Sequence, residues 1–164
     1  MPADRRVLQR PAIRPGQDGD APGFIALIGR CWADYPGCIL DVDAEVPELR
    51  ALATYFGGLG GALWVAGDVA GMIAARPLAT GAWEICKVYV HPDLHGSGLA
   101  QALLDVAEGH AAAAGATRLE LWTDTRFERA HRFYARRGYV RGECRALQDL
   151  SCSWEWRYER AAQS

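Results

Sequence analysis

The stretch Val88–Leu104, VYVHPDLHGSGLAQALL, changes character at its middle. Its first residues read as the end of a strand, whereas its last residues are an apolar run typical of a helix. Between them lies His95–Gly98, a turn built mostly of small residues. The first amide N–H groups of a helix have no intrahelical partner and carry partial positive charge. Glycine lets an anion approach such amides closely, so this turn predicts a phosphate site.

Two familiar phosphate motifs are absent from this turn. Gly98 is followed by Leu99 rather than by the lysine of a P-loop, and the third glycine of a dinucleotide-binding GxGxxG is missing. A turn of this composition also serves as a plain strand-to-helix connection. The turn alone therefore does not identify a ligand.

The pattern on both sides of this stretch predicts a mixed α/β domain. Strands are predicted at residues 7–15, 62–67, 69–77, 82–90, 118–123, 139–144 and 151–160, and helices at residues 23–35, 47–58, 98–115 and 128–138. Gly67-Asp68 predicts a two-residue hairpin turn, and the third helix has an apolar stripe of Leu99, Leu103, Val106 and His110. This order fits one sheet with helices on its faces, in a single domain over residues 1–164.

The composition excludes several classes of protein. Half of the 164 residues are hydrophobic and the net charge is −2, so we expect neither a nucleic-acid partner nor a membrane surface. Five cysteines without CxxC spacing, and histidines without HxxxH pairs, predict no disulfide framework and no metal. The amino-terminal residues lack the apolar run of a signal peptide, and no run reaches the ~18 residues of a membrane span. We therefore expect a cytoplasmic protein.

Two segments together resemble a known family. The run Val88–Leu104 resembles the acetyl-CoA motif of the GCN5-related N-acetyltransferase (GNAT) superfamily, Q/R-x-x-G-x-G/A, which falls on His95–Ala100. The segment Arg129–Val140 is similar to the second motif of that family, A-x-x-F-Y-x-x-x-G-F/Y. The resemblance extends from about residue 7 to residue 160. It implies a central mixed sheet flanked by about four helices, acetyl-CoA as co-substrate, and direct acetyl transfer to a primary amine.

The resemblance also implies which residues bind the cofactor. They are Val88, Tyr89 and Val90 of the predicted strand and His95, Gly96, Ser97, Gly98, Leu99, Ala100 and Gln101 of the turn and helix. The backbone amide of Val88 is the expected donor to the thioester carbonyl oxygen. His95 stands where the family usually has Gln or Arg, and Phe127 stands where many members have Asn. Because the turn binds through its amides, we expect phosphate binding to survive both departures.

Two side chains are candidates for proton transfer. The resemblance points to Tyr134 as the acid that protonates the departing thiolate, and the alternative is a core aromatic residue. Glu84 is a carboxylate within an apolar strand, eleven positions before His95, and is the candidate base. It could instead face solvent or pair with a cross-strand arginine, in which case ordered water would carry the amine proton away. Its period-2 neighbours Cys86, Val88 and Val90 are apolar.

The acceptor is open between a small-molecule amine and a protein lysine or N-terminus. The segment at residues 34–48 carries carboxylates that could attract a cationic amine or form a solvated loop, namely Asp34, Asp41, Asp43, Glu45 and Glu48. Other hypotheses are a non-catalytic acyl-CoA-binding sensor or subunit and an unrelated nucleotide-binding domain. A homodimer is also possible, because the aromatic last strand with Trp154 and Trp156 could supply a buried surface, although both could be core residues.

Overall fold

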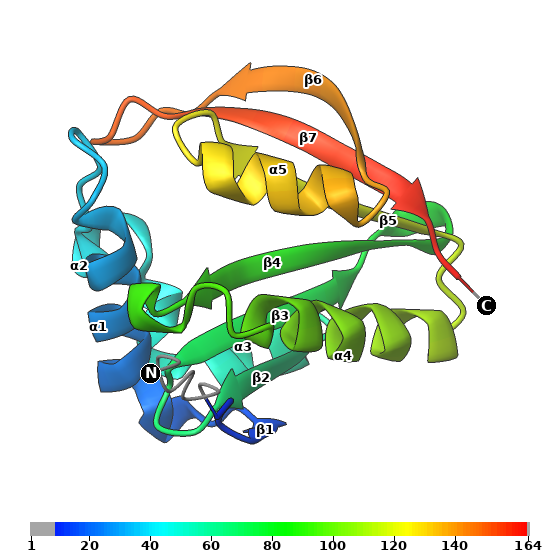
Figure 1. Cartoon of the computed structure of the whole chain (residues 1–164), viewed down its shortest axis with the longest axis horizontal. Coiled ribbons are helices and arrows are strands. Elements are labelled where there is room, and N and C mark those ends of the chain that lie inside the picture. The colour runs from blue at the N-terminus through cyan, green and yellow to red at the C-terminus, as the bar shows by residue number, and fades with distance from the viewer. Residues whose placement is uncertain (1–8, 164) are drawn as a thin grey trace, which may run out of the picture.

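One sheet of seven strands organises the chain, in the order β1-β2-β3-β4-β5-β7-β6 (Figure 1). The computed structural model describes residues 9–163. The strands are β1 (Ile13–Pro15), β2 (Ala62–Ala66), β3 (Gly71–Pro77), β4 (Ala82–Val90), β5 (Arg118–Asp124), β6 (Val140–Ala146) and β7 (Trp154–Ala161). Only β4 and β5 pair in parallel. The sequence prediction of a single mixed sheet is confirmed, although β1 is shorter than predicted and residues 7 and 8 lie outside the described residues.

Helices cover both faces of this sheet. They are α1 (Ala21–Trp32), α2 (Val42–Glu45), α3 (Leu52–Gly58), α4 (Leu99–Ala113) and α5 (Glu128–Arg136), with short 3-10 turns that include η2 (Pro47–Ala51). The four predicted helices are present, and α2 is an additional single turn. Buried side chains of α1, η2 and α3 pack on one face, while those of α4 and α5 pack on the other. No described helix is long and apolar enough to cross a membrane.

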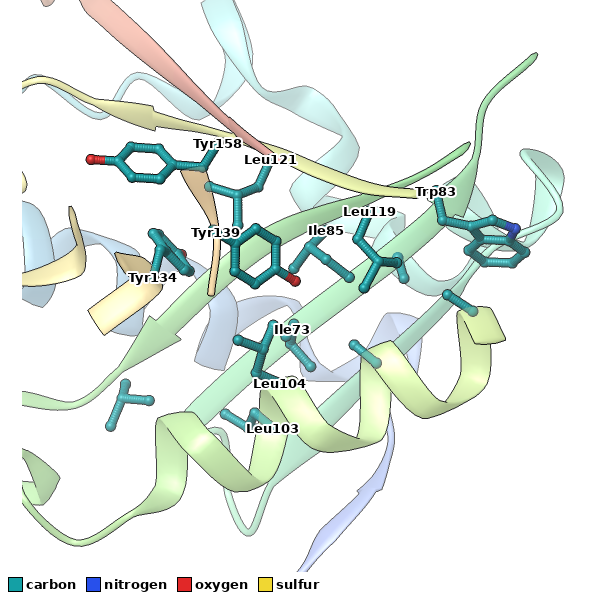
Figure 2. Packing of buried hydrophobic residues seen from close by; sticks show 14 of the residues in the cluster. Ile73, Trp83, Ile85, Leu103, Leu104, Leu119, Leu121, Tyr134, Tyr139 and Tyr158 are labelled. Carbon is teal, nitrogen blue, oxygen red and sulfur yellow. The ribbon is translucent and has the colours of Figure 1, made fainter. Parts of the chain in front are cut away.

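The core beneath α4 is continuous with the core beneath α5. Figure 2 shows leucines of α4 facing Ile73 and Ile85 of the sheet, with Tyr134, Tyr139 and Tyr158 closing the far side. The buried stripe of α4 runs through Leu103, Leu104, Ala107 and Ala111 rather than through Val106 and His110. His110 instead lies at the surface against the rings of Trp64 and Trp83, at centroid distances of 5.1 and 5.6 Å.

The turn between β2 and β3 is longer than the predicted two residues. Ala66 pairs with Gly71, so four residues connect the strands. Val69 adopts a left-handed φ of 60° and is buried. A Cβ atom on Gly23 would lie 2.6 Å from a Val69 methyl, so the two residues are in close contact. The burial of Val69 against α1 is what overrides the short-turn signal of Gly67-Asp68.

The parallel strands β4 and β5 separate soon after they begin. Their recorded partners are Ala82 with Arg118, Trp83 with Leu119 and Glu84 with Glu120, yet β4 continues to Val90. Over the same length β5 remains paired with β7 as far as Asp124. The edge of β4 that faces β5 therefore has no strand partner beyond Glu84 among the described residues. Backbone groups left open in this way require another partner, either water or a ligand.

A β-bulge in β4 accompanies this separation. Met72 pairs with Tyr89 and Ala74 pairs with Cys86, so β4 contains one extra residue opposite β3. The extra residue is Lys87, which has a left-handed φ of 54°. A bulge bends its strand and shifts the alternation of side chains by one position. This corrects the predicted face of Glu84: Cys86 shares its face, whereas Val88 and Val90 point into the opposite core.

The last strand begins later than predicted, at Trp154 rather than Ser151. The preceding Cys152 has a left-handed φ of 49°, which interrupts the strand conformation. Trp154 is 55% exposed, and the ring of Trp156 lies under the Arg141 guanidinium carbon at 4.5 Å. Because Trp154 is this exposed, it is not a core residue. The homodimer through the last strand stays a prediction.

Candidate active site

A cavity of about 580 Å³ opens where β4 and β5 separate. It lies between the end of α1, the second half of β4, the turn before α4, and α5. Its lining includes Cys31, Trp32, Asp34, Tyr35, Val88, Tyr89, Val90, His95, Gly96, Gly98, Leu99, Ala100, Gln101, Phe127, Arg129, Ala130, Phe133, Tyr134, Arg136 and Arg137. Nine of the ten residues predicted to bind the cofactor are in this lining, together with the predicted acid Tyr134.

The turn before α4 presents several free amides. Gly96 and Gly98 have left-handed φ angles of 80° and 84°, which side chains rarely adopt. Within residues 9–163, no acceptor is recorded for the backbone N–H groups of Gly96, Gly98, Ala100 and Gln101. Ser97 behaves differently, because its hydroxyl accepts a hydrogen bond from the Leu99 amide at 3.2 Å. Ser97 therefore stabilises the turn, and its neighbours supply the free donors.

Positive charge surrounds this turn. Arg129, Arg136 and Arg137 line the cavity, and the only acidic residue in the described lining is Asp34. Arg137 is itself paired with Asp105 and Glu108, so Arg129 and Arg136 contribute more of the positive charge. Arg10 Nη1 donates to the Gly98 carbonyl at 3.3 Å, which holds a further guanidinium beside the turn. Arg10 was not found by sequence reasoning, because it lies 88 positions from its partner and belongs to no local motif. The arrangement suits a ligand with several negative charges.

His95 adds little charge to the turn at neutral pH. Burial lowers the pKa of His95 below its ordinary value of 6.5, and the nearby positive charge of Arg129 lowers it further. The imidazole is therefore mainly neutral at pH 7. Positive potential near the turn comes from the arginines and the helix amides.

Tyr134 brings a phenol to the floor of the cavity. It is a buried residue of α5, on the same helical face as Ala130, which also lines the cavity. Its hydroxyl has no hydrogen-bond partner within the described residues, so it is free to meet a ligand. Burial raises the pKa of Tyr134, with small contributions from Tyr89 and Cys86. The phenol is thus held in its protonated, donor form.

A second phenol lies near Tyr134. Trp32 Nε1 donates to the Tyr89 hydroxyl at 3.2 Å, which joins the end of α1 to β4. Burial raises the pKa of Tyr89. Trp32 and Tyr35 line the cavity, but sequence reasoning missed them as site residues. Their helical spacing indicated only a buried helix face, and no motif marks them.

Glu84 is not in the lining of the cavity. Its carboxylate accepts from Arg76 Nε at 3.0 Å, and the Cys86 thiol donates to the same oxygen at 3.1 Å. Arg76 is the directly opposite residue on β3. The cross-strand arginine considered from the sequence is therefore present, and the role of Glu84 as base stays a prediction.

Each carboxylate of the acidic segment at residues 34–48 has a partner within the protein. Asp34 pairs with Arg30, Asp43 with Arg50 and Glu48 with Lys87, while Asp41 caps α2 and Glu45 accepts from the Leu150 amide. Such pairing reduces the field that these carboxylates exert on a cationic acceptor. Their predicted attraction for an amine stays a prediction.

Comparison with known proteins decides the family. A profile of the Acetyltransferase (GNAT) family matches residues 27–139, which is more than half of the chain. The chain belongs to the GNAT acetyltransferase family. The match includes the segment Val88–Leu104 and all but the last residue of the segment Arg129–Val140. No curated protein matches the chain.

Solved structures share the GNAT fold. A GNAT acetyltransferase from Staphylococcus aureus Mu50 superposes with a TM-score of 0.80 at 19% identity, covering 93% of this chain and 99% of that one. The acetyltransferase yncA from Salmonella typhimurium, determined with acetyl-CoA, has a TM-score of 0.69 at 16% identity, covering 93% and 94%. A ribosomal-protein-alanine N-acetyltransferase from Brucella melitensis has a TM-score of 0.69 at 15% identity, covering 92% and 99%. At these identities the likeness shows the fold alone.

The state of His95 can be measured directly. We expect its C2 proton to titrate in an NMR experiment with a pKa below 6.5, because burial and Arg129 both disfavour the charged imidazole. Replacing Arg129 by Gln should raise that pKa, since a like charge is removed. A native His95 that titrates at or above 6.5 would contradict this account of the turn.

Proposed function

We propose that this GNAT protein is an N-acetyltransferase that moves an acetyl group from acetyl-CoA to a primary amine by direct transfer in a ternary complex. One observation carries the proposal: a turn with four free amides leads along the open edge of β4 to the protonated hydroxyl of Tyr134. Acetyl-CoA has charged phosphates at one end and a reactive thioester at the other, and these two ends suit the turn and Tyr134 respectively.

The residues present fit acetyl-CoA. The free amides of Gly96, Gly98, Ala100 and Gln101 would hold the diphosphate, and the surrounding arginines would balance its charge. The open edge of β4 at Val88–Val90 would hold the pantetheine arm by strand-like hydrogen bonds. Acetyl-CoA supplies the acetyl group in activated form, as a thioester. The chain would position the thioester and the amine next to each other, and two reactants held in contact react far faster than free ones.

Tyr134 would act as the acid. Burial raises the pKa of Tyr134 and keeps the phenol protonated, so its hydroxyl can donate a hydrogen bond to the departing thiolate. Because a thiol has an ordinary pKa of about 8.5, below that of a phenol, transfer of the proton itself requires close contact between the two groups. The backbone amide of Val88 would donate to the thioester carbonyl oxygen, where negative charge develops. Both groups belong to elements that border the gap between β4 and β5.

The amine must lose a proton before it attacks, since a free alkylamine has a pKa of about 10.4. Glu84 is one candidate base, and ordered water is the other. The ion pair with Arg76 keeps the Glu84 carboxylate on β4 near the point where the strands separate. The acceptor is either a small-molecule amine or a protein lysine or N-terminus.

The proposed function predicts thiol release that depends on the turn. With acetyl-CoA and a panel of a polyamine, an aminoglycoside and a lysine-containing peptide, the native protein should release CoA thiol with at least one amine. Gly98→Glu should abolish acetyl-CoA binding in calorimetry, because a carboxylate would occupy the phosphate position. The control is Gly115→Glu, which has the same left-handed backbone at the other end of α4 and open space around it. Equal binding by both variants would refute the proposed site.

The role of Tyr134 predicts a loss of rate without a loss of binding. Tyr134→Phe should lower kcat about a hundredfold and change the Kd for acetyl-CoA less than about twofold. The raised pKa of Tyr134 also predicts that its ionisation causes no decline of kcat as pH rises to 10. Tyr158→Phe is the control, because its ring lies in the same cluster but outside the cavity lining. A full rate in Tyr134→Phe would assign the acid to water or another group.

Two variants that disrupt the same ion pair, Glu84→Gln and Arg76→Gln, distinguish a catalytic base from a structural carboxylate at Glu84. If Glu84 is the base, Glu84→Gln should lower kcat about a hundredfold, while Arg76→Gln should lower it much less. The measurement is kcat together with the denaturation midpoint of both variants. Equal losses of stability with unchanged kcat would show that the pair is structural and that water carries the proton.

A further inference from the structure

Buried polar side chains gather at one point in the fold. The described residues include four buried polar side chains, Thr123, Asp124, Ser151 and Ser153, and all lie where β5 ends beside the loop before β7. Burial of polar groups is costly unless each finds a partner. The hydrogen-bond partners of these four side chains therefore need to be identified.

Arg126 hydrogen-bonds to two of these four side chains and to the backbone carbonyl of a third residue. Its Nε and Nη2 donate to the two carboxylate oxygens of Asp124 at 2.9 and 2.8 Å. Its Nη1 donates to the Ser151 carbonyl at 3.3 Å, and Nη2 donates to the Ser153 hydroxyl at 3.2 Å. Burial would raise the pKa of Asp124, but the hydrogen bonds from Arg126 outweigh burial and lower it. One guanidinium thus ties the end of β5 to the loop at residues 147–153, in the forked geometry that only arginine provides.

The same loop is tied to the segment that follows α1. The Ile39 amide donates to the Ser151 hydroxyl at 2.8 Å, and that hydroxyl donates back to the Ile39 carbonyl at 3.2 Å. The Leu150 amide donates to Glu45 at 2.9 Å. In Figure 1 these two segments approach each other near the start of β7, on the side of α2. We call Asp124, Arg126, Ser151, Ser153 and Ile39 the Arg126 junction.

The Arg126 junction lies directly behind one wall of the cavity. Gly37 has a left-handed φ of 87°, and a Cβ atom there would lie 3.3 Å from Arg126 Nη1. Tyr35 and Phe127, the near neighbours of Gly37 and Arg126, pack with ring centroids 4.8 Å apart. Both rings line the cavity. The junction therefore supports the wall formed by Tyr35 and Phe127, while the turn before α4 belongs to a separate part of the chain.

We propose that Arg126 is a positioning residue for the acceptor amine: it fixes the Tyr35–Phe127 wall and the segments at residues 33–46 and 147–153 that continue from it. This inference rests on the proposed N-acetyltransferase function. Acetyl-CoA would be held by the glycine turn and β4, which the junction does not contact in the recorded hydrogen bonds. Loss of the junction should therefore weaken use of the acceptor and leave acetyl-CoA binding intact.

The test compares two arginine-to-lysine variants. Arg126→Lys keeps the charge but cannot hold Asp124, Ser151 and Ser153 together. Arg14→Lys is the matched control, because Arg14 also binds one carboxylate, that of Asp20, with two hydrogen bonds of 2.9 and 2.8 Å, and lies on the edge strand β1, three strands away from β4. With the best amine of the panel, Arg126→Lys should raise the acceptor KM about tenfold and leave the acetyl-CoA Kd within about twofold of native. Arg14→Lys should leave both values unchanged.

Hydrogen exchange supplies a readout that needs no acceptor. Arg126→Lys should speed amide exchange in both segments, 33–46 and 147–153, because one junction orders the two, and Arg14→Lys should not. Unchanged exchange in either segment would overturn the proposal. Faster exchange with an unchanged acceptor KM would also overturn it, since the junction would then be only structural. If no amine releases thiol from acetyl-CoA, the proposed function fails, while the exchange result still decides whether Arg126 couples the segments.

Discussion

The separation of β4 from β5 is the constraint on which the rest of the site depends. After three paired residues the two strands part, and the backbone edge of β4 loses its strand partner. The bulge at Lys87 bends β4 at this place and turns Val88 and Val90 toward the α4 side of the sheet. A sheet that stayed paired would have filled the gap with its own hydrogen bonds. The open edge of β4 and the cavity follow from this interruption in pairing, whereas the free amides of the turn come from the start of α4.

Two sides of the cavity differ in chemistry: one presents backbone N–H groups and arginines, and the other presents aromatic side chains. The turn before α4 offers main-chain donors and borders arginines, so it suits a polyanion whatever the side chain at position 95. Another wall of the cavity is aromatic and consists of Trp32, Tyr35 and Phe127. Trp32 is held by its hydrogen bond to Tyr89, and the rings of Tyr35 and Phe127 pack against each other. Tyr134 lies between them as a protonated phenol in a buried environment. In the proposed function, the turn would anchor the cofactor and the aromatic wall would shape the space for the second substrate.

Periodic and motif-bearing parts of the chain could be predicted from sequence, whereas long-range contacts could not. The aromatic and β-branched residues of β4 and the apolar run of α4 predicted the positions of these elements, and the glycine turn indicated free amides that the structure contains. The bulge at Lys87 and the buried turn residue Val69 were missed, because a left-handed φ at a non-glycine residue leaves no mark in the sequence. Trp32 and Arg126 act through partners 57 and 25 to 27 positions away, so no local pattern reveals them.

We infer that free backbone amides of the turn and the open edge of β4 would hold acetyl-CoA. The most direct measurement is an amide chemical-shift map of the ¹⁵N-labelled protein during titration with CoA. The account predicts that the largest shifts fall on Gly96, Gly98, Ala100 and Gln101, with smaller shifts at Val88–Val90. Shifts that leave these amides unchanged while CoA binds elsewhere would contradict it.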